Sequence, residues 1–208
     1  MSNLLSYAKS SPKKAVPRVF VALTKLTDAL CDAIRTSGTI STTGWKQLST
    51  LGGAQVKLLQ ETSDLETDQS GIVDVVRDKM PIEVEMTLSA VGLMELFNVM
   101  KSDPTQTTPT NPEHMSLREN RGLSLKTYGV SFLIYDKAND TSNETDVPDV
   151  DADAETVVIY NAIHTGEKDI AWKTGEQNTA TITFRALANS GSGSAAGTMG
   201  EVGAFTAV

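Results

Sequence analysis

The sequence predicts an α+β fold whose main element is an antiparallel β-sheet. Residues 82–88 and 179–186 alternate apolar and polar side chains, as strands do when one face lies on a core and the other faces water. Such alternation disfavours the parallel sheet of an α/β enzyme, whose strands are apolar on both faces. Helical spacing of apolar residues occurs at residues 17–36 and 90–100, which gives the fold two predicted helices.

Residues 17–36 are predicted to form an N-terminal amphipathic helix. Apolar residues recur there at spacings of three and four, and polar residues occupy the other side. Pro17 suits a first helical position, and Gly38 suits the position where a helix ends. Cys31 lies near the edge of the apolar stripe, so we expect a small buried side chain rather than a reactive thiol.

After this helix the sequence changes to a period of two. Residues 45–51 and 55–59 are predicted to form short strands, separated by a break at Gly52–Gly53. Residues 61–71 are acidic and rich in turn-forming residues, so we expect a loop there. The clearest strand of the first half, residues 82–88, follows this loop.

A second helix is predicted at residues 90–100, with Ser89 as its N-terminal cap. It is apolar around most of its surface, which indicates that other parts of the fold cover it. Residues 101–121 follow as a long polar loop that contains three prolines. A loop of this length in a compact domain is usually functional or disordered.

The second half of the chain is strand-like. Residues 123–135 alternate with one phase slip, residues 140–155 form an acidic loop, and residues 156–164 form a β-branched apolar strand. The alternating strand at residues 179–186 then completes the sheet. We expect a single domain over residues 1–188 and a flexible Gly/Ser-rich tail over residues 189–208.

Composition argues against several classes of function. The net charge of −8 and the aromatic content of 5% disfavour nucleic-acid binding, and one cysteine excludes a disulfide framework or a cysteine-based zinc cluster. One of the two histidines lies in the proline-rich loop, the other ends a strand, and no nucleophile elbow is present. We therefore expect no enzyme activity, no cofactor and no metal ion. No segment is apolar enough to span a membrane.

Alternating carboxylates in the segment Asp149–Glu155 are the strongest candidate for ion binding, because hard oxygen ligands hold Ca²⁺. An EF-hand beginning at Asp149 fails, since Ala154 and Tyr160 stand where Gly and Glu are required. A solvated acidic loop is the preferred interpretation. A calcium-dependent, β-rich binding module stays open as an alternative function, and a hydrolase with dispersed carboxylates as a third.

Residues 45–100 resemble the major tail tube proteins of bacteriophages. The stretch reads WKQLSTLGGAQVKLLQETSDLETDQSGIVDVVRDKMPIEVEMTLSAVGLMELFNVM. The features that carry the resemblance are a glycine near an early strand, an acidic loop, a strand and a following helix. In this chain the loop contains Glu61-Thr62, Leu65-Glu66 and Asp68-Gln69-Ser70, and the strand is Val84–Leu88.

The resemblance implies a β-sandwich or barrel-like fold flanked by an α-helix, to which the N-terminal helix would be an addition. It implies a structural virion protein, made in the host cytoplasm, whose hexameric rings stack into a tail tube. DNA would pass through the tube only as cargo. The expected partners are further copies of the chain and other tail proteins: terminator, baseplate or tip, tape measure and a sheath.

The resemblance also gives two sets of candidate residues. Glu83, Glu85 and Thr87 form the polar face of one strand and are expected to face the lumen or a neighbouring subunit; an ordinary solvated strand face is the alternative. Two acids on one face cost energy unless they meet water or a basic partner, and an acidic lumen would repel DNA. The candidate inter-ring or inter-subunit positions are Glu61, Asp64, Leu65, Glu66 and Asp68.

Overall fold

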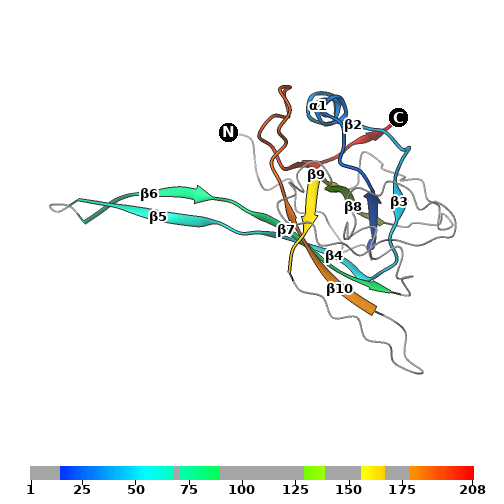
Figure 1. Ribbon diagram of the computed structural model, residues 1–208, viewed down its shortest axis with the longest axis horizontal. Helices are drawn as coiled ribbons and strands as arrows, with labels where there is room; N and C mark the ends of the chain where they lie inside the picture. Colours follow the sequence, from blue (N-terminus) through cyan, green and yellow to red (C-terminus); the bar gives the residue numbers. More distant parts are fainter. Residues whose placement is uncertain (1–14, 68–70, 90–128, 139–155, 167–178) are drawn as a thin grey trace, which may run out of the picture.

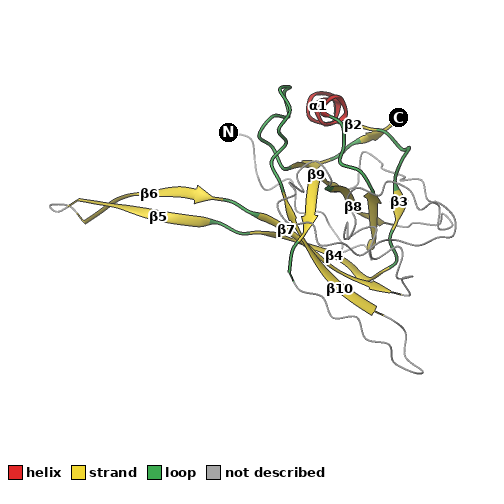
Figure 2. Ribbon diagram, in the orientation of Figure 1, coloured by secondary structure: helices red, strands yellow, loops and turns green. Residues whose placement is uncertain are grey.

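The structure is a computed structural model of the 208-residue chain. It describes residues 15–67, 71–89, 129–138, 156–166 and 179–208, which contain twelve strands and one helix (Figures 1 and 2). In chain order the elements are β1 (Ala15–Ala22), α1 (Asp28–Ser37), β2 (Thr39–Ile40), β3 (Lys46–Gln47), β4 (Thr50–Leu58), β5 (Glu61–Thr67), β6 (Gly71–Lys79), β7 (Ile82–Ser89), β8 (Val130–Ala138), β9 (Thr156–His164), β10 (Thr179–Ala186), β11 (Gly200–Gly203) and β12 (Thr206–Ala207).

Most of these strands belong to one antiparallel sheet, which confirms the sheet type predicted from the sequence. Its order is β3-β1-β8-β9-β10-β7-β4, and β11 pairs with β9. The two ends of this order, β3 and β4, follow each other closely in the chain. Leu48 lies between them in the sequence, and its N–H donates to the Val19 carbonyl of β1 at 2.8 Å. Residues 46–58 therefore pair first with β1 and then with β7, and they close the sheet into a barrel.

The barrel has one core inside it and a second core on its outer side, beneath α1. The interior core contains Phe132 and Phe184, whose rings meet edge to face with centroids 4.8 Å apart. The outer core joins one side of the barrel to α1 and the C-terminal residues. Its members are Phe20, Ala22, Cys31, Ile34, Ile40, Trp45, Leu133, Tyr135, Val158, Tyr160, Ala195 and Phe205.

The predicted helix over residues 17–36 is wrong in its first half, where β1 stands. Val19 faces the barrel interior, and its neighbour Phe20 packs in the outer core; each is 1% exposed. A strand buried on both faces loses the alternation that distinguishes it from a buried helix. The apolar spacing in this segment therefore mimicked a helical stripe.

The second half of that prediction corresponds to α1, which has defined caps at both ends. The Thr27 side chain accepts a hydrogen bond from the Leu30 N–H at 3.4 Å, as an N-cap residue does. Gly38 has a φ of 65°, and its N–H donates to the Ile34 carbonyl at 3.0 Å. The expected burial of Cys31 is confirmed, since this residue of α1 is 1% exposed.

Residues 61–71 contain strand β5 rather than the predicted loop. β5 and β6 form a two-stranded sheet that continues β4 and β7 outward and reaches far from the barrel (Figure 1). We call this hairpin, residues 61–67 and 71–79, the arm. The nine residues of β6 span about 30 Å at the usual rise per residue. The acidic composition indicated a turn because exposed strand residues, as residues 61–64 are, show no apolar alternation.

The predicted break at Gly52–Gly53 is also wrong, because β4 runs through both glycines. Their φ values of 81° and 83° lie in the left-handed region that favours glycine. The pairing with β7 shifts register between Thr50 and Ala54. The two glycines therefore make a bulge in a continuous strand rather than an end.

Residues 189–208 pack on the domain instead of forming the expected flexible tail. β11 pairs with β9, and β12 pairs in parallel with β2. The Asp32 carboxylate accepts hydrogen bonds from the Ser194 hydroxyl at 3.0 Å and from the Ala195 N–H at 2.7 Å. A side chain at Gly193 would overlap that carboxylate. Glycine here permits close approach of the backbone to the Asp32 side chain, which composition alone does not distinguish from flexibility.

The remaining predicted segments are either observed or lie outside the described residues. β7, β9 and β10 correspond to the strands predicted at residues 82–88, 156–164 and 179–186. β8 begins at Val130, within the strand predicted at residues 123–135. The segments outside the described residues are the predicted helix 90–100, the loop 101–121 and the acidic loop 140–155 with its candidate calcium ligands.

Candidate interaction surfaces

The outer side of β4, β7 and β10 carries a polar surface, which we call the polar face. Inward-pointing residues of β10 and β7 are buried, and the residues between them are exposed or half-buried. Glu83 and Glu85 are half-buried on this face. The described members of the polar face are Gln55, Lys57, Glu83, Glu85, Thr87, Thr181, Thr183 and Arg185.

The register of the three strands places a basic residue on each side of Glu83. Lys57 of β4 and Arg185 of β10 both lie opposite it. The Lys57 ammonium contacts the diagonal acid instead, at 2.5 Å from the Glu85 carboxylate. Thr87 and Thr181 share a hydrogen bond of 2.8 Å across the strands. The described residues of this face therefore carry two positive and two negative charges.

The other predicted set of residues lies on the arm, away from the polar face. Glu61 and Asp64 are exposed on β5, and Leu65 and Glu66 follow on the same strand. Asp68 lies outside the described residues. The two strands of the arm pair with each other and with no other described strand.

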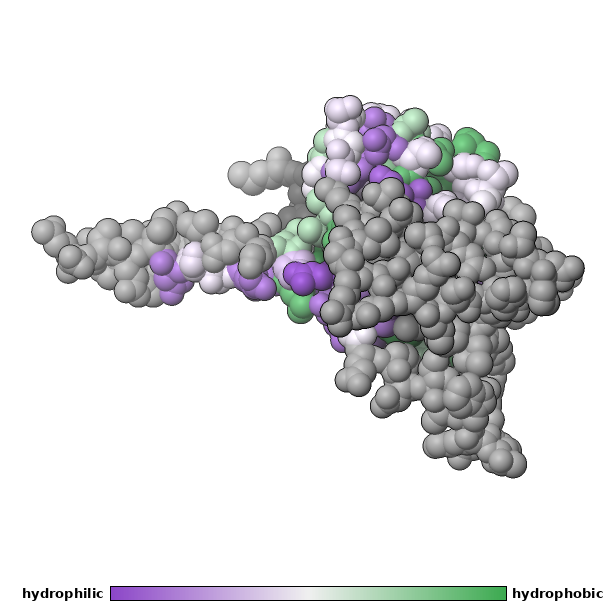
Figure 3. Space-filling view, in the orientation of Figure 1, coloured by the Kyte–Doolittle hydropathy of each residue, from purple (hydrophilic) through white to green (hydrophobic). Residues whose placement is uncertain are grey.

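An apolar patch at the base of the arm was not predicted from the sequence. Leu58 is 65% exposed, Leu59 is 43% exposed and Met80 is 41% exposed. We call these three residues the root patch, and apolar colour is visible where the arm meets the barrel in Figure 3. Only the fold brings Met80 beside the two leucines, because the whole arm separates them in the sequence.

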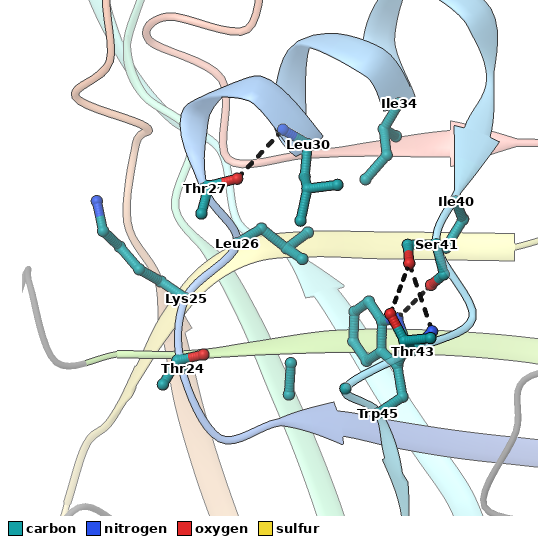
Figure 4. Close-up of a pocket in the computed structure, with 12 residues that line it drawn as sticks. Thr24, Lys25, Leu26, Thr27, Leu30, Ile34, Ile40, Ser41, Thr43 and Trp45 are labelled. Carbon is teal, nitrogen blue, oxygen red and sulfur yellow. Dashed lines mark hydrogen bonds between the residues drawn. The ribbon is translucent and has the colours of Figure 1, made fainter. Parts of the chain in front are cut away.

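A pocket of about 130 Å³ lies between α1 and the segment that precedes β3. Leu26, Leu30 and Ile34 approach it from α1 and its N-terminal side, and Ile40 and Trp45 lie opposite them (Figure 4). The Trp45 indole N–H donates to the Ser41 carbonyl at 2.8 Å, which fixes the ring. We call this hollow the α1 pocket; sequence reasoning missed it because its walls come from separate elements.

One charged residue, Lys25, is among the twelve residues that line the α1 pocket. It is half-buried and lies across Leu26 from the Trp45 ring in Figure 4. Asp28 is close by in sequence, but its carboxylate lies against Gly191 of the C-terminal segment and is not part of the lining. The pocket is therefore an apolar hollow with a basic rim.

Buried titratable groups near α1 lack the properties of a reactive site. Burial, with smaller contributions from Asp28 and Asp32, raises the pKa of the Cys31 thiol to about 11. Burial also raises the pKa of Tyr160, whose hydroxyl donates to the Cys31 carbonyl at 3.3 Å. A thiol with a raised pKa is a poor nucleophile. In the part of the chain that the structure describes, no cluster of three or more potential metal ligands occurs.

No helix within the described ranges is long and apolar enough to cross a membrane.

Comparisons with known proteins give distant structural similarities. No protein-family model matches the chain, and no curated protein sequence matches it significantly. A chain in a cryo-EM structure titled the sheath–tube complex of an extracellular contractile injection system, PVC, in the extended state, is similar at a TM-score of 0.48 and 11% identity, over 99% of both chains.

Two further structures show weaker similarity. The tube-terminating cap of the anti-feeding prophage matches at a TM-score of 0.44 and 11% identity, over 98% of this chain and 99% of that one. A crystal structure of an Hcp protein matches at a TM-score of 0.29 and 11% identity, over 92% and 99%. Such scores and identities by themselves assign neither fold nor function to this chain.

Proposed function

We propose that this chain is a structural tube subunit, which assembles into stacked rings that surround a channel. The observation that carries the proposal is the combination of a closed barrel and a long two-stranded arm that leaves it (Figure 1). An arm of this kind is a means of contact with another copy of the chain. Residues 45–100, which resemble tail tube proteins, contain the whole arm.

The arm supports assembly because a two-stranded sheet is marginally stable alone in water. Its backbone edges pair with no other described strand, and Glu61 and Asp64 keep it soluble in the free chain. A contact between the arm of one copy and the barrel of the next is heterologous. Contacts of this type close into rings or continue without limit, which a stacked tube requires.

The polar face is the surface that we assign to the channel wall. The opposite side of the barrel is covered by α1 and the C-terminal residues, through the outer core. DNA adheres to a protein when basic groups displace its counterions, and here Lys57 and Arg185 lie beside two acids. A charge-balanced wall with threonine hydroxyls lets a charged cargo pass without strong attraction or repulsion.

The finer points of the proposal follow the sequence resemblance. Rings of six subunits, passage of DNA and location in the tail of a virion or a virion-like particle are the properties that it implies. Terminator, baseplate or tip, tape measure and sheath proteins are then the partners at the ends, inside and outside of the tube. The proposed role is structural and needs no catalytic residue, cofactor or metal ion.

The test removes the arm and leaves the barrel. The Leu59 N–H donates to the Pro81 carbonyl at 2.9 Å, so the two chain segments meet at the base of the arm and residues 60–80 can be replaced by a short Gly/Ser linker. We expect this variant to keep the β-sheet circular dichroism and cooperative melting of the parent chain, and to stay monomeric in sedimentation velocity. Folded, arm-deleted protein that still forms rings or tubes would contradict the proposal.

A further inference from the structure

The α1 pocket is an apolar hollow at the surface that the fold itself does not fill. Leu30 on its wall is 37% exposed, whereas Trp45 and Ile34 are buried. Its volume of about 130 Å³ is close to the roughly 150 Å³ of an engineered apolar cavity that takes up benzene. One aliphatic side chain from outside is thus the right size to occupy it.

The rim of the pocket determines which aliphatic side chain fits best. Lys25 is its charged lining residue, and the N-terminal turn of α1 begins at Thr27 on the same wall. Both features favour negative charge next to the apolar group that enters. Asp28 does not cancel this preference within the hollow, because its carboxylate lies on the side of α1 that faces Gly191.

The arm contains one segment with this chemistry. In residues 61–79, Leu65 is the apolar residue with an acid on each side, Asp64 and Glu66. Asp64 is exposed in the middle of β5, where it pairs with Val75 of β6. The arm leads away from α1 of its own chain (Figure 1), so the pocket that it meets belongs to another copy.

We propose that the α1 pocket of one copy receives the Asp64–Leu65–Glu66 segment of the arm of a second copy, with Lys25 beside the two acids. This inference rests on the proposed function, and it names the surface on which the arm docks. Each copy then contributes its arm to one contact and its α1 pocket to another. The same contact repeats from copy to copy and never saturates, as a stacked assembly needs.

Disulfide trapping between two separately purified variants tests the proposal. Leu65→Cys supplies a thiol on the arm, and Leu30→Cys supplies one at the pocket wall. The wild-type chain is a control because its one cysteine, Cys31, is buried. Leu65→Cys mixed with Thr181→Cys is the matched control, since Thr181 is exposed on the polar face. After mild oxidation we expect a covalent dimer from the first mixture that exceeds either control at least several-fold.

Charge reversal provides a second, independent readout. Lys25→Glu should lower the yield of assemblies in sedimentation several-fold, and the double variant Lys25→Glu with Glu66→Lys should restore it. Lys46→Glu is the control, because Lys46 is exposed on β3 and does not line the pocket. A double variant that assembles no better than Lys25→Glu alone would overturn the pairing.

The outcomes separate this inference from the proposed function. If the wild-type chain forms rings or tubes but the Leu65→Cys and Leu30→Cys mixture gives no more dimer than its control, the pocket assignment is wrong and the tube role stands. Leu30→Cys that crosslinks to itself would show a two-fold contact and would also overturn the assignment. If the wild-type chain stays monomeric at all concentrations, both proposals fail.

Discussion

Replacement of Gly200 by alanine is a sharp test of how the C-terminal residues stabilise the domain. Gly200 lies opposite Ile159 where β11 pairs with β9. A Cβ atom there would overlap the Val158 carbonyl oxygen and lie 3.1 Å from its carbonyl carbon. Because the obstacle is backbone, no side-chain rotation relieves it, and β11 has to move away from β9.

The cost follows from the contacts that β11 makes. Displacement of the strand weakens two or three backbone hydrogen bonds, each with a net contribution of about 1 kcal/mol. The lower entropy of the unfolded alanine variant offsets about 0.4–1 kcal/mol of this loss. The expected decrease in the free energy of unfolding is therefore about 2 kcal/mol, which corresponds to a melting temperature about 4–8 °C lower for a chain of this size.

The same strand provides its own control. A Cβ atom at Gly203 would have no atom within 4 Å, so Gly203→Ala should leave the melting temperature unchanged or raise it slightly. Thermal melts followed by circular dichroism measure both variants. Equal melting temperatures for Gly200→Ala and Gly203→Ala would refute the close packing of β11 on β9.

Three further predictions concern single side chains. The Cys31 thiol should resist alkylation at pH 8 in the folded chain and react in denaturant. Because folding raises the pKa of this thiol from 9.0 to about 11, the free energy of unfolding should fall as the pH rises from 9 to 11. Fast alkylation of the folded chain would contradict its burial. Lys57→Ala should lower the free energy of unfolding by less than about 1 kcal/mol, measured by urea titration, since the Glu85 pair is partly exposed. Leu58→Asp should leave the melting temperature within a few degrees, since the exposed root patch contributes little to the fold. It should reduce assembly in sedimentation, since an exposed apolar patch is typical of a contact surface. A collapse of the melting temperature would show that Leu58 belongs to the core.

The sequence predicted the strands that have one face on the core and one face in water. In β7 and β10 that condition produces strict alternation, and residues such as Val84 and Phe184 were assigned to the buried face correctly. β1 was misread because Val19 and Phe20 are both buried, on opposite sides of the barrel wall. Period alone does not separate such a strand from a helix.

Contacts between segments far apart in the chain explain the other differences. The described side chains of the arm, residues 61–64, are exposed, so its acidic residues resembled a turn until pairing with β6 was known. Gly193 and Gly200 resembled a linker because composition does not show which glycines approach a carboxylate or a carbonyl closely. Lys57 balances Glu85 only through the register of β4 on β7, and no local pattern contains that register.

The most direct test of the central claim is electron microscopy of the purified full-length chain over a wide range of concentrations. The proposed function predicts hollow rings, or tubes of uniform width, whose averaged density places the polar face on the channel wall and the arm against another copy. Tubes with the polar face on their outer surface would contradict the assignment of the channel wall. A chain that remains monomeric at every concentration, with its arm intact, would contradict the tube role itself.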